Sequence, residues 1–188
     1  MANEKFIKQV RYGVAETNSS SSHSVTWLGN TPVTSGDFTD QYLCKNNTLI
    51  VCPEEYGWEW RTLSSADERL NYLIALIVDF MKAHYHWETD KITPENLYGY
   101  DDFKKVEAII REYTEFDQVR LREDFEKYPE RLRQDVGVDH QSSTDEYINI
   151  DEFLSVWHVD LPTFLFGDVE IRTGNDNETD PENYEDSW

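Results

Sequence analysis

One helical segment constrains the fold of this chain more than any other feature. Ser65-Ala66-Asp67-Glu68 has the form of a capping box, in which a serine and a glutamate three residues later satisfy each other's backbone amides. We predict a helix from here to about His84. Its apolar stripe consists of Leu70, Leu73, Ile74, Ile77, Val78 and Met81, widened by Leu76 and Phe80. A helix with this much apolar circumference belongs at the centre of a fold.

The segments before this helix predict β-strands. Residues 6–14 and 24–28 alternate loosely, and residues 48–52 form a short β-branched run that ends at Pro53. We therefore expect a small, mainly antiparallel N-terminal sheet packed on the long central helix.

The segments after it predict more helix. A second amphipathic helix is expected over residues 101–113, a short one from Thr93-Pro94, and another within residues 144–157. Residues 160–166 read as an apolar turn, and 168–171 as a last strand. The predicted class is α+β, with a single domain over residues 1–172 and an acidic tail over 173–188.

The formal charge of −21 is unevenly distributed along the 188 residues. Residues 1–53 are neutral, whereas residues 135–188 hold 15 acids and one base, Arg172. Such a surface disfavours direct contact with a nucleic-acid backbone, because phosphate contacts need lysine and arginine. It favours proteins whose own sites are basic. No apolar run approaches the length of about 18 residues that a membrane span needs.

The run from Arg11 to Ser24, RYGVAETNSSSSHS, allows two interpretations. It can be a serine-rich turn between strands, with hydroxyls bonded to local backbone. It can also be a pocket for an oxyanion or phosphate. The residues predicted to bind such a ligand are Arg11, Asn18, Ser19, Ser20, Ser21 and Ser22, joined by Gln141 and Ser142 of a second polar cluster.

Each polar cluster contains a histidine. His23 and His140, with Asp139 beside the latter, are the candidate catalytic residues if the chain is an enzyme, since a histidine with a carboxylate partner can act as a general base. The phosphate-loop, dinucleotide-glycine and Gly-x-Ser-x-Gly motifs are missing from the sequence. The sequence predicts no metal site and no cofactor.

The run EEYGWEW at 54–60 interleaves acids with aromatic residues. It is either a turn whose rings cover the edge of the core, or an exposed contact patch, since tyrosine and tryptophan anchor many protein interfaces. On the second interpretation Glu54, Glu55, Trp58 and Trp60 bind a protein. The acidic tail would add Asp176, Glu178, Asp180, Glu182, Glu185 and Asp186.

Four pieces of the chain together resemble a widespread group of bacteriophage-encoded proteins of unknown function. They are ETNSSSSHS at 16–24, EYGWEW at 55–60 followed by NYLIAL, DHQSS at 139–143, and FLFGDVEIRTGNDN at 164–177. The resemblance implies phage origin and an accessory role during infection. It brings no reaction, and it does not extend to the acidic end beyond Asp176. Because the N-terminal residues MANEKFIKQV lack the long apolar stretch of a secretory signal, we expect residence in the host cytoplasm.

Two functions follow as hypotheses. The first is an acidic accessory protein, similar to a DNA mimic, that binds and inhibits or redirects a host nucleic-acid-binding protein. Its target could be a CRISPR effector, a restriction enzyme or RNA polymerase, so that an anti-defence role is one form of this hypothesis. The second is a small phosphate- or nucleotide-handling enzyme that uses the serine-rich and histidine motifs. We expect a protein partner, no direct contact with nucleic acid and no membrane contact.

Overall fold

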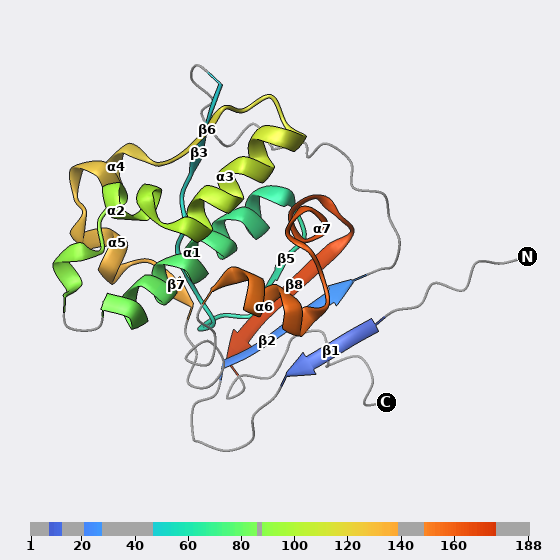
Figure 1. Ribbon diagram of the computed structural model, residues 1–188. Coiled ribbons are helices and arrows are strands. Elements are labelled where there is room, and N and C mark those ends of the chain that lie inside the picture. Colours follow the sequence, from blue (N-terminus) through green and yellow to red (C-terminus); the bar gives the residue numbers. More distant parts are fainter. Residues whose placement is uncertain (1–7, 13–20, 28–46, 86–87, 139–148, 176–188) are drawn as a thin grey trace, which may run out of the picture.

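The computed structural model describes residues 8–12, 21–27, 47–85, 88–138 and 149–175. The chain is of mixed helix and strand, as predicted. Figure 1 shows the helices gathered around one long helix, α1, with a four-stranded sheet along one side of them. The strands of this sheet come from both ends of the described chain.

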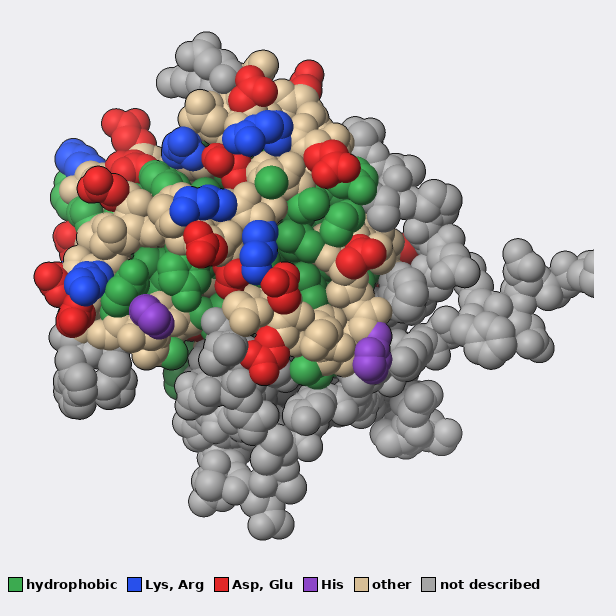
Figure 2. All heavy atoms as spheres, viewed as in Figure 1, with side chains coloured by type: hydrophobic (Ala, Val, Ile, Leu, Met, Phe, Trp, Pro, Cys, Tyr) green, Lys and Arg blue, Asp and Glu red, His purple; other side chains and the backbone are tan. Residues whose placement is uncertain are grey.

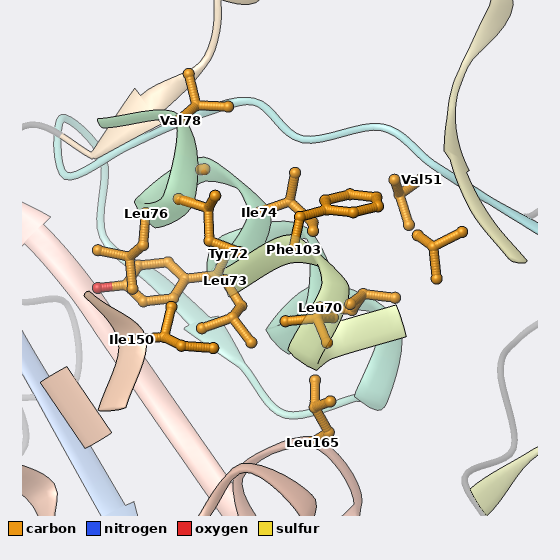
Figure 3. Close-up of a cluster of buried hydrophobic side chains, with 14 of the residues drawn as sticks. Val51, Leu70, Tyr72, Leu73, Ile74, Leu76, Val78, Phe103, Ile150 and Leu165 are labelled. Atoms are coloured by element: carbon orange, nitrogen blue, oxygen red, sulfur yellow. The ribbon is translucent and has the colours of Figure 1, made fainter. Parts of the chain in front are cut away.

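Helix α1, Ala66–Tyr85, is the predicted central helix. It starts with the predicted capping box: the Ser65 amide donates to Glu68 Oε2 at 2.9 Å, and the Glu68 amide donates to Ser65 Oγ at 3.3 Å. Every residue from Leu70 to Val78 is buried. Figure 3 shows these side chains surrounded by residues of other elements, among them Phe103, Ile150 and Leu165. The helix is therefore covered on all sides from Leu70 to Val78, whereas its last turn includes the exposed Ala83 and His84.

The sheet is antiparallel, with the order β1, β2, β8, β5. Its strands are β1 Lys8–Tyr12, β2 Ser21–Trp27, β8 Val169–Asn175 and β5 Arg61–Leu63. The prediction of a purely N-terminal sheet is thus corrected: β1 and β2 do pair, but a strand from the other end of the chain lies beside them. Strand β8 also runs to Asn175, so it includes the first three residues of the expected acidic tail, 173–175.

The predicted strand at 48–52 does not join this sheet. It forms β3, Thr48–Val51, and pairs in parallel with β6, Gln118–Leu121. A second parallel pair joins β4, Glu55–Tyr56, to β7, Gly137–Val138. Parallel strands need a long crossover, and the helical segment between the members of each pair supplies it.

The remaining helices pack around α1. The predicted second amphipathic helix is α3, with the expected bounds Asp101–Tyr113, and the Thr93 hydroxyl caps the helix expected after it. The segment 160–166, expected as a turn, is a short helix capped by Asp160. The full set is η1 Thr89–Lys91, α2 Pro94–Gly99, α3 Asp101–Tyr113, α4 Glu123–Lys127, α5 Glu130–Gln134, α6 Ile150–Trp157 and α7 Leu161–Phe166.

Candidate functional site

The turn between β4 and β5 presents an exposed tryptophan among carboxylates. We call residues 54–61 the Trp58 turn. Gly57 has φ 110°, a conformation that side-chain-bearing residues rarely adopt, so glycine is needed where the chain reverses. The next side chain, Trp58, is 52% exposed. Among the described residues, Trp58 and Tyr128 are the two large hydrophobic side chains left exposed.

Two aromatic residues hold the Trp58 turn in place. Tyr56 is 3% exposed, and its ring meets that of Tyr72 on α1 edge to face, with 5.3 Å between centroids. Trp60 packs on β8, where a Cβ added to Gly174 would lie 2.3 Å from the indole. Tyr56 and Trp60 therefore hold both sides of the exposed Trp58. Trp60 is half-buried and supports the turn, and its predicted contact with a partner stays a prediction.

A hollow of about 330 Å³ lies at the Trp58 turn and contains residues of the predicted contact patch. Another hollow, of about 400 Å³, lies between α2, α3 and the start of α6. The hollow at the Trp58 turn is lined by Glu54, Glu55, Gly57, Trp58, Glu59 and Arg61. Three acids thus face one base. The hollow includes Glu54, Glu55 and Trp58 of the predicted contact patch but not Trp60, and it adds Glu59 and Arg61, which the sequence analysis did not single out.

Arg61 partly neutralises the hollow. Its Nη1 donates to Glu54 Oε1 at 2.5 Å, its Nη2 lies 3.5 Å from Glu59 Oε2, and its Cζ lies 6.0 Å from the centre of the Tyr56 ring. Partial burial works to lower the pKa of Arg61, but the carboxylates of Glu54 and Glu59 outweigh it and raise that pKa. The guanidinium is therefore charged at every physiological pH.

The Trp58 turn is connected through strand pairing to two other segments, the serine-rich run and the segment that ends before the Asp139 cluster. Through β8, Gly174 pairs with Ser22, and Thr173 pairs with both Arg61 and His23. Through β7, Glu55 pairs with Gly137 and Tyr56 with Val138, the last described residue before the Asp139 cluster. Figure 1 shows the ends of β8 and β7 and the start of β2 at the same lower end of the molecule.

The serine-rich run lies partly on a strand, which corrects the expectation of a loop. Ser21, Ser22 and His23 belong to β2 and pair with Asn175, Gly174 and Thr173. Arg11 lies on β1, opposite Ser24. The other predicted site residues, namely Asn18, Ser19, Ser20, Asp139, His140, Gln141, Ser142, Asp176, Glu178, Asp180, Glu182, Glu185 and Asp186, lie outside the described residues. The phosphate-handling hypothesis therefore stays a prediction.

The hollow of about 400 Å³ was not predicted from the sequence. It is lined by residues of α2, α3 and the start of α6, and Lys105 spans it between two carboxylates. The Lys105 Nζ lies 3.1 Å from Asp102 Oδ1 and 2.6 Å from Asp151 Oδ2. The other oxygen of Asp102, Oδ2, accepts from the Ile150 amide at 3.0 Å. These contacts fix the start of α6 on α3. The adjacent acids Asp101 and Asp102 are the only sequence signal for this site, and acids are common at the start of any helix.

A buried carboxylate near β7 was also missed. Asp79 Oδ2 accepts from the Val138 amide at 2.5 Å, and Lys82 donates to the Val136 carbonyl at 2.5 Å and lies 3.3 Å from Asp79 Oδ1. Burial raises the pKa of Asp79 to about 6, against the opposing effects of Lys82 and the Val138 amide. The pair anchors β7 on the last turns of α1, just ahead of the Asp139 cluster.

Within the ranges given above, no three His, Cys, Asp or Glu side chains gather in a geometry that could hold a metal ion. The helices of those same ranges include none with the length and apolar character needed to cross a bilayer.

The chain was also compared with known proteins. It matches no protein-family model, no curated protein sequence and no solved structure.

Proposed function

We propose that this chain is a phage-encoded acidic accessory protein that binds a host nucleic-acid-binding protein in the host cytoplasm and inhibits or redirects it. The observation that carries the proposal is the Trp58 turn, in which an exposed indole stands among three carboxylates on a firmly held loop. An inhibitor of a defence system, such as a CRISPR effector or a restriction enzyme, is one form of this function.

The physical argument starts from interface energetics. Tryptophan is among the residues most enriched at binding hot spots, and ordering a loop on binding costs free energy. Because Tyr56 and Trp60 already fix the Trp58 turn, little of that cost remains when a partner binds. The surrounding carboxylates favour a basic partner, and the net charge of −21 favours its approach over a longer range.

The acidic charge is not continuous over the whole molecule. Figure 2 shows acidic and basic side chains interspersed on the face that it displays. Ion pairs among the described residues also offset acidic charge, such as Arg131 with Asp135 at 2.8 Å and Lys105 with Asp151. The described residues of this face therefore lack the continuous array of carboxylates that would imitate the phosphates of duplex DNA. The proposal instead concentrates recognition in the Trp58 turn, with the acid-rich end of the sequence contributing attraction.

The test is a pull-down from host lysate with the tagged full chain, followed by mass spectrometry. It is run in 0.1 M and 1 M salt, where the Debye length is about 10 Å and about 3 Å. We expect a nucleic-acid-binding protein to be enriched at low salt and lost at high salt. Enrichment of no basic protein, or capture that does not respond to salt, would overturn the proposal.

A matched pair of variants locates the surface. Trp58→Ala removes the indole of the Trp58 turn, and Tyr128→Ala removes the other exposed large hydrophobic side chain, which is 45% exposed. Loss of capture in the first variant and retention in the second would support the proposal. Equal capture by both variants and by the original chain would show that the Trp58 turn does not bind the partner.

A further inference from the structure

We propose that the Trp58 turn binds an arginine side chain presented by the basic surface of its partner, between the Trp58 indole and the carboxylates of Glu55 and Glu59. This inference rests on the proposed function and specifies what the Trp58 turn recognises.

The Trp58 turn already holds one guanidinium, that of Arg61. The strong contact of Arg61 is to Glu54, at 2.5 Å, whereas its contact to Glu59 is 3.5 Å and leaves that carboxylate 76% exposed. Glu55 forms no ion pair with any residue that the structure describes. An ionised carboxylate offers about four acceptor positions. Glu55 and Glu59 therefore retain the capacity to accept from a second cation.

A guanidinium fits this arrangement better than an ammonium. Arginine presents a planar fork of donors that matches carboxylates, and its flat face stacks on an aromatic ring. Trp58 offers such a ring, 52% exposed and lining the same hollow as Glu55 and Glu59. A lysine ammonium is a strongly hydrated point charge that gains less from the indole. Arginine is also one of the residues that contact phosphates on nucleic-acid-binding surfaces.

The size and charge of the hollow exclude other occupants. About 330 Å³ is at the lower end of the range of about 300–1,000 Å³ found for small-molecule sites, which suits one long side chain. Its lining carries three acids and one base, so a phosphate or nucleotide would be repelled. A neutral apolar side chain would leave the carboxylates without partners.

Arg61 competes with the incoming arginine. The two guanidinium groups would share Glu59 and repel each other at short range. Removal of the Arg61 charge while its volume is roughly kept, as in Arg61→Gln, should therefore strengthen arginine binding. A purely structural role for Arg61, in which it only shapes the turn, predicts the opposite result.

The test uses NMR titration of the full chain with N-acetyl-arginine amide and with N-acetyl-lysine amide, each carrying one positive charge. The readout is the indole N–H signal of Trp58, assigned by its loss in Trp58→Phe. This local signal excludes binding elsewhere on the acidic chain, and the other five tryptophans of the sequence report whether each variant is folded. We expect arginine to bind about two- to fivefold more tightly than lysine, as a cation–π contact at an exposed site allows.

Three substitutions complete the test. Glu59→Gln should weaken arginine binding by about two- to threefold, and Arg61→Gln should tighten it by a similar factor, as exposed ion pairs do. Glu95→Gln, at an exposed position on α2, removes the same charge as Glu59→Gln and should leave the titration unchanged. Equal binding of arginine and lysine, or weaker binding in Arg61→Gln, would overturn the inference.

The two proposals fail in different ways. Arginine-selective binding at Trp58 with no basic protein captured from lysate would overturn the proposed function and leave the arginine site standing. Capture that depends on Trp58, without any preference for arginine over lysine in the titration, would overturn the arginine site and leave the proposed function standing.

Discussion

Trp60 lies directly against Gly174, the β8 residue that pairs with Ser22 on β2. The contact is so close that a single added carbon on Gly174 would lie 2.3 Å from the indole. It joins the turn between β4 and β5 to a strand from the far end of the chain. The exposed Trp58 is held in place through this contact.

Gly174→Ala tests that contact. The new methyl group must displace the Trp60 indole, and we expect a loss of about 1–3 kcal/mol in the free energy of unfolding, as for other overpacked positions. Urea denaturation measures it. Gly99→Ala is the control, since a Cβ at Gly99 meets nothing within 4 Å. An equal effect of both substitutions would show that Trp60 moves aside freely.

Asp79 makes stability depend on pH. Its folded-state pKa of about 6 lies above the ordinary value of 3.8, so the folded chain binds this proton more tightly than the unfolded chain. The stabilising effect of the proton is present at low pH and is lost as pH rises from about 4 to about 6, by up to about 3 kcal/mol. Lys82, Glu55 and the Val138 amide are the groups that face this carboxyl.

Asp79→Asn should remove that contribution and retain an oxygen that accepts from the Val138 amide. The measurement is the free energy of unfolding across pH 4 to 8 for the variant and the original chain, with the difference between the two profiles taken. Asp101→Asn, at a side chain that is 92% exposed, is the control for loss of one charge. Parallel profiles for Asp79→Asn and the original chain would contradict the prediction.

Arg69 holds the turn between α7 and β8 onto α1. Its buried guanidinium donates to the carbonyls of Leu165 at 2.7 Å, Val169 at 2.6 Å and Ser64 at 2.5 Å. Arg69→Met keeps much of the volume but leaves these carbonyls without a donor, so we expect a loss of about 3 kcal/mol in unfolding free energy. Lys104→Met on the surface of α3 should change it by less than about 0.5 kcal/mol. Similar effects of the two would contradict the role of Arg69.

The triple variant His23→Ala, Asp139→Ala, His140→Ala separates the two functional hypotheses. Because the proposed function acts through the Trp58 turn, this variant should capture the same host protein and support phage growth as well as the original chain does. Pull-down and plaque counts measure the two properties. A growth defect with unchanged capture would favour the phosphate-handling enzyme.

The sequence predicted elements whose signals are local. The capping box at Ser65 and Glu68, the extent of α1 and the bounds of α3 all depend on residues within one or two helical turns of each other. Such interactions act in any surroundings, so they can be identified without the rest of the chain. The acid and aromatic pattern of residues 54–60 allowed either a turn whose rings cover the core or an exposed contact patch, and it did not separate the buried Tyr56 from the exposed Trp58.

Tertiary structure decided how these elements are joined. A short strand carries no signal for which partner it pairs with, so neither the position of β8 between β2 and β5 nor the parallel pairing of β3 with β6 could be predicted. The same holds for side chains. Trp58 and Trp60 are chemically alike, but Gly174 gives Trp60 a place to pack, and Trp58 has none. The sequence by itself determined the long helices α1 and α3 and the acidic character of the protein, while long-range packing selected which tryptophan stays exposed.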